Sequence, residues 1–228
     1  MSKEQIKSRD RVVNHGEVFT NEREVNAMLD LVKQETERLD SRFLEPACGD
    51  GNFLIEILRR KLELAVTRSK RDPYLFKKYS IIAVSSIYGV ELLKDNAMEC
   101  RNRLFEFVKT VYKKIERQED ESYLNSIRFL LLKNIVCGDA LTLKDEKSNP
   151  VTFAEWGFRD DFVTRRDFHL ATILEAESTK DWAKDDGKQI SLFSFEESNL
   201  DEYVENLNKP IKEYDEIHFL KIGESYND

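Results

Sequence analysis

The feature that most constrains this chain is a glycine-containing turn within residues 43–54, Phe-Leu-Glu-Pro-Ala-Cys-Gly-Asp-Gly-Asn-Phe-Leu. A short apolar run comes first and is broken by Pro46, which predicts a strand that ends there. Gly49 and Gly51 can adopt backbone angles that other residues avoid, and they let a ligand approach the main chain closely. Apolar residues then recur at helical spacing from Asn52 onward. The segment predicts a strand, a turn and a helix whose first N–H groups face a ligand.

The rest of the chain alternates between helical and strand patterns. Helices are expected from near Asn21, over 75–86, over about 94–117 and near 122–132, while apolar runs predict strands at 87–91 and from 135. This alternation indicates crossover connections and a parallel sheet flanked by helices. We therefore expect an α/β, Rossmann-like domain over residues 21–175, preceded by an N-terminal segment of residues 1–20.

Acidic residues end two of the predicted strands. Glu91 closes the run 87–91, where a carboxylate can accept hydrogen bonds from both hydroxyls of a ribose. Asp139 follows the third strand, where a carboxylate can accept from an adenine amino group. Either residue alone is equally explained as a solvated carboxylate at a strand end. Together with a turn that has only two glycines and so lacks a full pyrophosphate-binding pattern, they predict S-adenosylmethionine as the cofactor.

Four segments resemble motifs of one known family. Residues 43–54 are similar to the Asp/Glu-Pro-x-Cys-Gly-x-Gly-x-Phe-Leu motif of the amino-N6 adenine DNA methyltransferases of bacterial restriction–modification systems. Residues 16–20 resemble that family's N-terminal cofactor motif, and residues 87–92 and 137–141 resemble its second and third motifs. The resemblance covers about residues 12–142 and implies a methyltransferase fold that acts on DNA. It places around the cofactor Thr20, Glu45, Ala47, Gly49, Glu91 and Asp139, and Gly51 belongs to the same turn.

The family's catalytic motif, Asn/Asp/Ser-Pro-Pro-Tyr/Phe, is absent from the chain. Methylation of an adenine amino group requires that the base be flipped out, stacked on an aromatic ring and held through its amine. The nearest candidate is Asn149-Pro150-Val151-Thr152-Phe153, which lacks the second proline. We take Asn149 and Pro150 as candidate catalytic residues; the alternative is an ordinary turn before a strand that starts at Val151. The catalytic loop is then divergent or supplied by a partner, such as a second restriction–modification subunit.

The last third of the chain differs in charge from the rest. Residues 1–150 contain 27 Lys and Arg against 25 Asp and Glu, a net charge of +2, so the total of −8 leaves −10 for residues 151–228. This balance argues against a generic DNA-coating protein, although the first part can approach a phosphate backbone. Arg159, Arg165 and Arg166 form a small basic cluster. They either contact nucleic acid or pair with the neighbouring carboxylates Asp160, Asp161 and Asp167.

Residues 176–228 are expected to form an acidic, mobile tail, because apolar residues are sparse there. Within it, Gln189-Ile190-Ser191-Leu192-Phe193 resembles the short peptide with which bacterial DNA-processing proteins dock on the replication sliding clamp. Gln189, Leu192 and Phe193 are the candidate partner-binding residues. The alternative is a segment that folds back on its own core.

Several classes of site and location are not indicated. The cysteines Cys48, Cys100 and Cys137 lack metal-ligand spacing and suggest reduced thiols, and the three histidines are too scattered for a metal site. No run approaches the roughly 18 apolar residues of a membrane span, and the N-terminus has no apolar signal region. We expect a cytoplasmic protein with no membrane contact.

Two hypotheses of function follow. The first is an S-adenosylmethionine-dependent DNA adenine-N6 methyltransferase, or the methylase subunit of a restriction–modification system. The second is a non-catalytic, cofactor-binding module that regulates or scaffolds a DNA-processing complex. Methylation of a small molecule or a protein fits the fold but not the adenine-specific form of the motifs.

Overall fold

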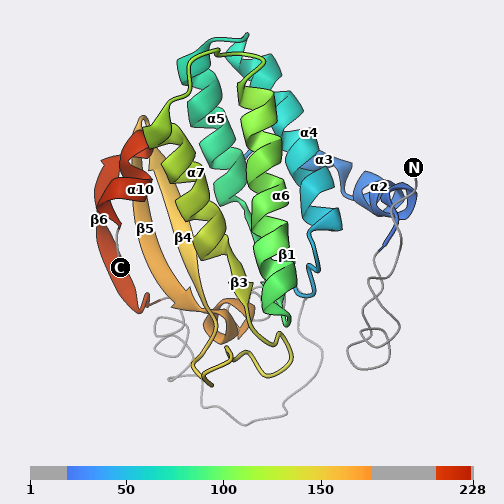
Figure 1. Ribbon diagram of the computed structural model, residues 1–228. Helices are drawn as coiled ribbons and strands as arrows, with labels where there is room; N and C mark the ends of the chain where they lie inside the picture. Colours follow the sequence, from blue (N-terminus) through green and yellow to red (C-terminus); the bar gives the residue numbers. More distant parts are fainter. Residues whose placement is uncertain (1–19, 176–208, 227–228) are drawn as a thin grey trace, which may run out of the picture.

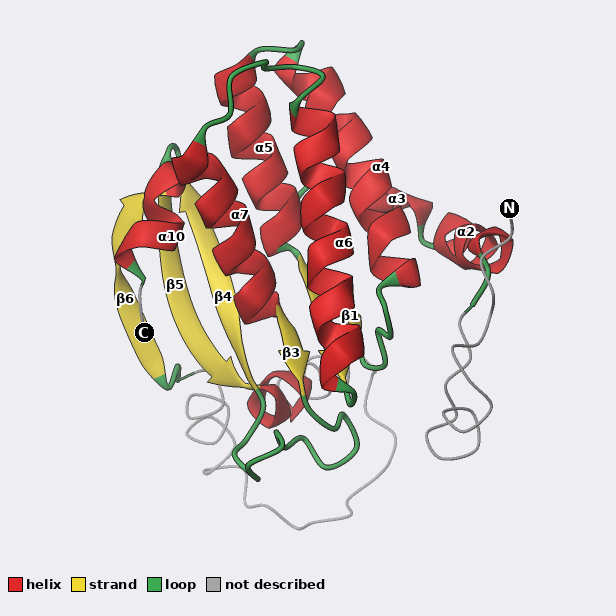
Figure 2. Ribbon diagram, viewed as in Figure 1, coloured by secondary structure: helices red, strands yellow, loops and turns green. Residues whose placement is uncertain are grey.

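A computed structural model describes residues 20–175 and 209–226 of the chain (Figure 1). Four long helices stand side by side in front of the strands, with two sheets behind them (Figures 1 and 2). The candidate clamp-docking residues Gln189, Leu192 and Phe193 lie outside the described residues. No helix of the described part is long and apolar enough to cross a membrane.

The first sheet is parallel and contains β1 (Phe43–Glu45), β2 (Ile87–Glu91) and β3 (Ile135–Cys137) in the order β1-β2-β3. Phe43 lies opposite Ile87, and Gly89 lies opposite Ile135. Every residue of the central strand β2 is buried, as expected for a parallel strand covered on both faces. The predicted α/β class and the parallel sheet flanked by helices are confirmed.

The helices connecting these strands bury apolar stripes in the core. They are α4 (Asn52–Ser69), α5 (Pro73–Ser85), α6 (Lys94–Tyr112) and α7 (Glu121–Asn134). Asp72 begins α5 by accepting the N–H of Leu75 at 2.8 Å, and Asp120 begins α7 by accepting the N–H of Tyr123 at 3.1 Å. Such caps satisfy N–H groups that have no partner within the helix.

Two N-terminal helices pack against α4. They are α2 (Glu22–Leu31) and the short α3 (Lys33–Thr36). Asn21 caps α2 by accepting the N–H of Glu24 at 3.0 Å, which agrees with a helix predicted to start near Asn21. Val25 and Leu29 are the buried residues of α2. Their packing brings Thr20, which immediately precedes α2, close to the first turn of α4.

The second sheet is antiparallel and was not predicted. It contains β4 (Thr152–Arg159), β5 (Phe162–His169) and β6 (Lys212–His218) in the order β4-β5-β6, followed by η2 (Phe219–Lys221) and α10 (Ile222–Ser225). Residues 209–226 were expected to belong to the mobile tail, and for them this expectation is wrong. Phe219, Ile222 and Tyr226 are at most 4% exposed, but they are too widely spaced among acidic residues to stand out in the composition.

Aromatic side chains join the second sheet to the rest of the molecule. The Tyr88 hydroxyl of β2 donates to the Ala154 carbonyl of β4 at 3.0 Å. The Trp156 indole N–H donates to the Asn134 side-chain carbonyl at the end of α7, at 2.9 Å. Satisfying both polar tips lets these large rings be buried. The aromatic run predicted to cover a sheet edge therefore lies largely inside the core.

Candidate cofactor site

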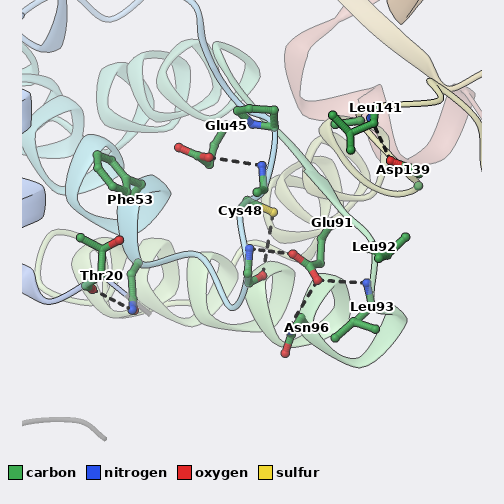
Figure 3. A pocket seen from close by; sticks show the side chains of 16 residues that line it. Thr20, Glu45, Cys48, Phe53, Glu91, Leu92, Leu93, Asn96, Asp139 and Leu141 are labelled. Carbon is green, nitrogen blue, oxygen red and sulfur yellow. Dashed lines mark hydrogen bonds between the residues drawn. The ribbon is translucent and has the colours of Figure 1, made fainter. Parts of the chain in front are cut away.

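A cavity of about 560 Å³ opens at the carboxyl ends of the three parallel strands (Figure 3). Small-molecule sites of open α/β sheets lie at this edge, and the volume falls within their usual range of about 300–1,000 Å³. Six of the seven predicted cofactor residues line it: Thr20, Glu45, Ala47, Gly49, Glu91 and Asp139. The structure thus gathers residues spread over 120 positions of sequence around one space.

The seventh predicted residue, Gly51, shapes the turn without lining the cavity. Gly49 and Gly51 have φ angles of +55° and +92°, in the left-handed region that glycine tolerates best. A Cβ at Gly51 would lie 2.7 Å from the Cys100 Sγ of α6. Glycine at this position therefore allows α4 and α6 to pack closely beneath the turn.

An arginine from α6 holds the turn from outside. The Arg103 guanidinium donates to the Asp50 main-chain carbonyl at 2.6 Å and to the Asn52 side-chain oxygen at 3.1 Å, and it lies 2.8 Å from the Asp50 carboxylate. The Asp50 side chain is 1% exposed, so this pair is nearly desolvated. Sequence reasoning missed Arg103, because no local pattern links it to a turn about 50 residues earlier.

Glu91 is bonded to the turn by its own carboxylate. It accepts the N–H of Gly49 at 2.9 Å, the N–H of Leu93 at 3.0 Å and the side-chain amide of Asn96 at 3.4 Å (Figure 3). A carboxylate has about four acceptor positions. One therefore remains for a ligand hydroxyl, and accepting both hydroxyls of a ribose requires one of these bonds to be exchanged.

Glu45 and Asp139 supply the other two carboxylates of the cavity. Glu45 accepts only the N–H of Ala47, at 3.2 Å, among the described residues. Asp139 accepts the N–H of Leu141 at 2.8 Å and the Thr142 hydroxyl at 3.0 Å. The backbone bond from Leu141, with the Thr142 hydroxyl, lowers the pKa of Asp139. Asp139 therefore stays ionised near neutral pH and can only accept hydrogen bonds.

Apolar side chains complete the rim. Leu92 and Leu141 line the cavity and are 55% and 95% exposed, and Phe53 lines it from the first turn of α4. Exposed leucines around a concave site suit a flat, partly apolar ligand. The predicted site omitted all three residues, although Leu92 directly follows Glu91 and could have been included on that ground.

Asn149 and Pro150 do not line the cavity. They belong to the turn between β3 and β4, where Asn149 donates its N–H and its side-chain amide to the Asp145 carboxylate at 2.8 Å and 3.1 Å. Asp145 returns its own N–H to the Asn149 carbonyl at 2.8 Å. β4 begins two residues after Pro150, as the turn interpretation predicted. The geometry is that of a closed turn and does not support a catalytic role.

The predicted arginine cluster is engaged with carboxylates. Arg165 pairs with Asp167, as one of the two interpretations expected. Arg159 pairs instead with Glu216 of β6, and Arg166 pairs with Glu155 of β4. The cysteines Cys48, Cys100 and Cys137 are free thiols. Within residues 20–175 and 209–226, no group of three or more His, Cys, Asp or Glu is placed to hold a metal ion.

Comparison with known proteins adds one match. A family model described as MmeI, DNA-methyltransferase domain, matches residues 19–165, which is more than half of the 228 residues. The chain belongs to this family. No curated protein and no solved structure matches it. The MmeI match begins one residue before Thr20 and contains every residue that lines the cavity, and it confirms the resemblance to restriction–modification methylases.

The limits of the MmeI match also bear on the fold. The match ends at residue 165, within β5. It therefore includes the whole parallel sheet and the first antiparallel strand, while β6, η2 and α10 lie beyond it. The candidate site belongs to the matched part, and the stretch of the second sheet that sequence reasoning missed does not.

Proposed function

We propose that this chain binds S-adenosylmethionine and serves as a DNA adenine-N6 methyltransferase, or as the methylase subunit of a restriction–modification system. One observation carries the proposal: in a member of the MmeI methyltransferase family, a cavity at the carboxyl ends of consecutive parallel strands gathers the glycine turn, Glu45, Glu91 and Asp139. We expect such a protein to act in the bacterial cytoplasm, with a Rossmann-like domain as its framework.

The donor set fits this cofactor. The N–H groups at the start of α4 suit the carboxylate of the methionine part, and Glu45 offers acceptor capacity to its ammonium. Glu91 has one position for a ribose hydroxyl, Asp139 can accept from the adenine amino group, and Leu92 and Leu141 present apolar surface to the ring. When bound, the cofactor supplies an activated methyl group. The chain's own residues bind it, orient it and exclude water from it.

The catalytic loop is the part of the site that this chain does not supply among its described residues. β1 pairs only with β2 there, so its other edge is open, and a parallel strand added at that edge would end beside Glu45 and Pro46 at the cavity. Strand addition is a common mode of recognition. A partner that provides a strand followed by the missing Pro-Pro-aromatic loop would complete the site.

Calorimetry with S-adenosylmethionine tests the cofactor site. We expect binding that weakens at least 10-fold in Glu91→Gln, because the substitution replaces an acceptor oxygen by an amide that cannot accept from Gly49. Glu106→Gln, which makes the same change at an exposed position of α6, should bind as the unmodified protein does. Absence of binding at about 1 mM cofactor would reject the proposed site.

Transfer of tritium from labelled cofactor to DNA tests the enzyme. We expect labelling when the partner subunit is present, with label in N6-methyladenine after hydrolysis of the DNA. The alternative function is a non-catalytic module, and the closed turn at Asn149 is the observation that favours it. Cofactor binding without labelling under any partner condition would select that alternative.

Docking on the replication sliding clamp through Gln189, Leu192 and Phe193 is a further part of the proposal and rests on the sequence alone. A Leu192→Ala, Phe193→Ala double variant should lose capture by immobilised clamp. A variant with Ser198→Ala and Asn199→Ala, in the same acidic segment, should keep it. Equal capture of both variants would reject the docking motif.

A further inference from the structure

A second cavity, of about 500 Å³, lies at the opposite end of the parallel sheet. Arg42 and Ser86, which line it, immediately precede β1 and β2, so it opens at the amino ends of these strands. The remaining wall comes from α4, α5 and β4. It is therefore formed where the helices, the parallel sheet and the antiparallel sheet meet.

Four aromatic side chains line this cavity. Tyr88 of β2 and Trp156 of β4 are 8% and 6% exposed, and both have their polar tips bonded within the protein. Tyr79 of α5 and Phe158 of β4 are half-buried and reach further out. The Tyr79 hydroxyl has no hydrogen-bond partner within the described residues. The wall thus offers ring surface for stacking and one hydroxyl for a ligand.

Cations stand at the mouth of the cavity. Arg68, at the end of α4, lines it and is exposed, with no hydrogen bond or ion pair in the described part of the chain. Lys70 and Arg71 follow it with φ angles of +51° and +65°, an unusual conformation for two consecutive residues other than glycine. Arg42 is held by Glu155 at 2.7 Å. The rim also contains Asp40, whose carboxylate accepts from Arg38 at 3.4 Å.

We propose that this cavity binds an unpaired nucleotide, with its base against Tyr79 and Phe158 and its phosphate at Arg68. Aromatic surface beside unneutralised cations is the combination that binds single nucleotides and single strands. A hydrophobic side chain of a protein partner would use the rings but would leave Arg68 without a role. Asp40 adds an acceptor for a base amino group.

This base is distinct from a methyl acceptor. Tyr88 and Glu91 are three residues apart on β2, so their side chains point to opposite faces of the sheet. The two cavities also open at opposite ends of the strands. The second cavity therefore binds nucleic acid or free nucleotide away from the proposed cofactor, and this inference does not depend on methyl transfer.

Trp156 provides a direct signal for occupancy, because its ring lines the cavity. The chain has two tryptophans, so the measurement uses the full chain with Trp182→Phe. Titrations with AMP, with TMP and with a ten-nucleotide single strand should change the Trp156 fluorescence. Saturation by the mononucleotides identifies a free nucleotide as the ligand, and saturation by the oligonucleotide alone identifies a strand; either supports the cavity.

Charge and stacking variants then separate this site from general attraction to phosphate. Arg68→Glu should weaken binding at least 10-fold, whereas Arg23→Glu, the same change at an exposed position of α2, should not. Tyr79→Leu should weaken binding, and Tyr79→Phe should keep most of it. Unchanged circular dichroism shows that each variant folds. No response to any probe at about 1 mM, or equal losses in Arg68→Glu and Arg23→Glu, would overturn the proposal.

Discussion

The parallel and antiparallel halves of this molecule use charged groups in opposite ways. In the parallel half, the carboxylates Glu45, Glu91 and Asp139 face a cavity and keep acceptor capacity for a ligand. In the antiparallel half, Arg165 and Asp167 face each other, with the Tyr214 hydroxyl donating to Asp167 at 3.2 Å. The first arrangement can bind something, whereas the second is closed on itself and fixes the sheet. Buried charge alone therefore does not mark a functional site.

Removing the buried arginine should produce the largest effect. Arg165 is 2% exposed at its side chain, makes two bonds of 2.8 Å and 2.7 Å to Asp167, and lies over the Tyr214 ring at 4.1 Å. Arg165→Met leaves the Asp167 carboxylate buried without its counter-charge, which costs about 3–5 kcal/mol. Urea denaturation should show this loss in the free energy of unfolding.

The neighbouring Arg166 provides the matched control for that experiment. It is 48% exposed at its side chain and pairs with Glu155 at the surface. Arg166→Met should cost less than about 1 kcal/mol, since exposed ion pairs contribute little. If both variants lost the same stability, the antiparallel half would not depend on its buried pair.

Arg103 tests whether the parallel half combines both uses of charge. Arg103→Met removes three contacts to the glycine turn and leaves the Asp50 carboxylate buried, so we expect a loss of about 2–3 kcal/mol in stability. Affinity for S-adenosylmethionine should fall with it, and Arg103→Lys should restore part of the affinity through one of the contacts. Lys113→Met on the same helix, 53% exposed, is the control. Unchanged cofactor affinity in Arg103→Met would limit the residue to a structural role.

Lys61 makes the stability of the parallel half depend on pH. Its side chain is fully buried on α4, and its ammonium donates to the carbonyls of Arg38, Leu39 and Ser41 at 2.8, 3.1 and 2.7 Å. Burial lowers the pKa of Lys61 to about 7. The folded protein therefore holds this proton less tightly than the unfolded chain does, and stability rises as pH increases above about 7.

Between pH 7 and pH 9 we expect the free energy of unfolding to rise by up to about 2 kcal/mol from this group. Urea denaturation at several pH values measures the rise. Lys61→Met should flatten the profile over this range, whatever its effect on stability at pH 7. A rise of the same size in Lys61→Met would assign the dependence to other groups.

The sequence predicted the parallel half well because its signals are local. The strand, turn and helix of residues 43–69 follow one another, and Glu91 and Asp139 each end their own strand. The antiparallel half depends on pairing between β5 and β6, about 50 residues apart, and no local pattern specifies such a partner. Arg103 was missed for the same reason. The tail prediction failed at residues 209–226 because a few buried aromatic residues outweigh an acidic average.

Asn149 lies in the connection between the two halves, and its substitution should have the smallest effect. The turn retains the bonds from the N–H groups of Lys147 and Asn149 to the Asp145 carboxylate when the amide is removed. Asn149→Ala should therefore change the free energy of unfolding by less than about 1 kcal/mol, and transfer of label to DNA in the presence of a partner should be unchanged. Loss of labelling with unchanged stability would return this turn to the catalytic site, and would mean that it opens when DNA binds. The closed geometry argues for the first outcome, because the side-chain amide and the main-chain carbonyl of Asn149 are already bonded to Asp145.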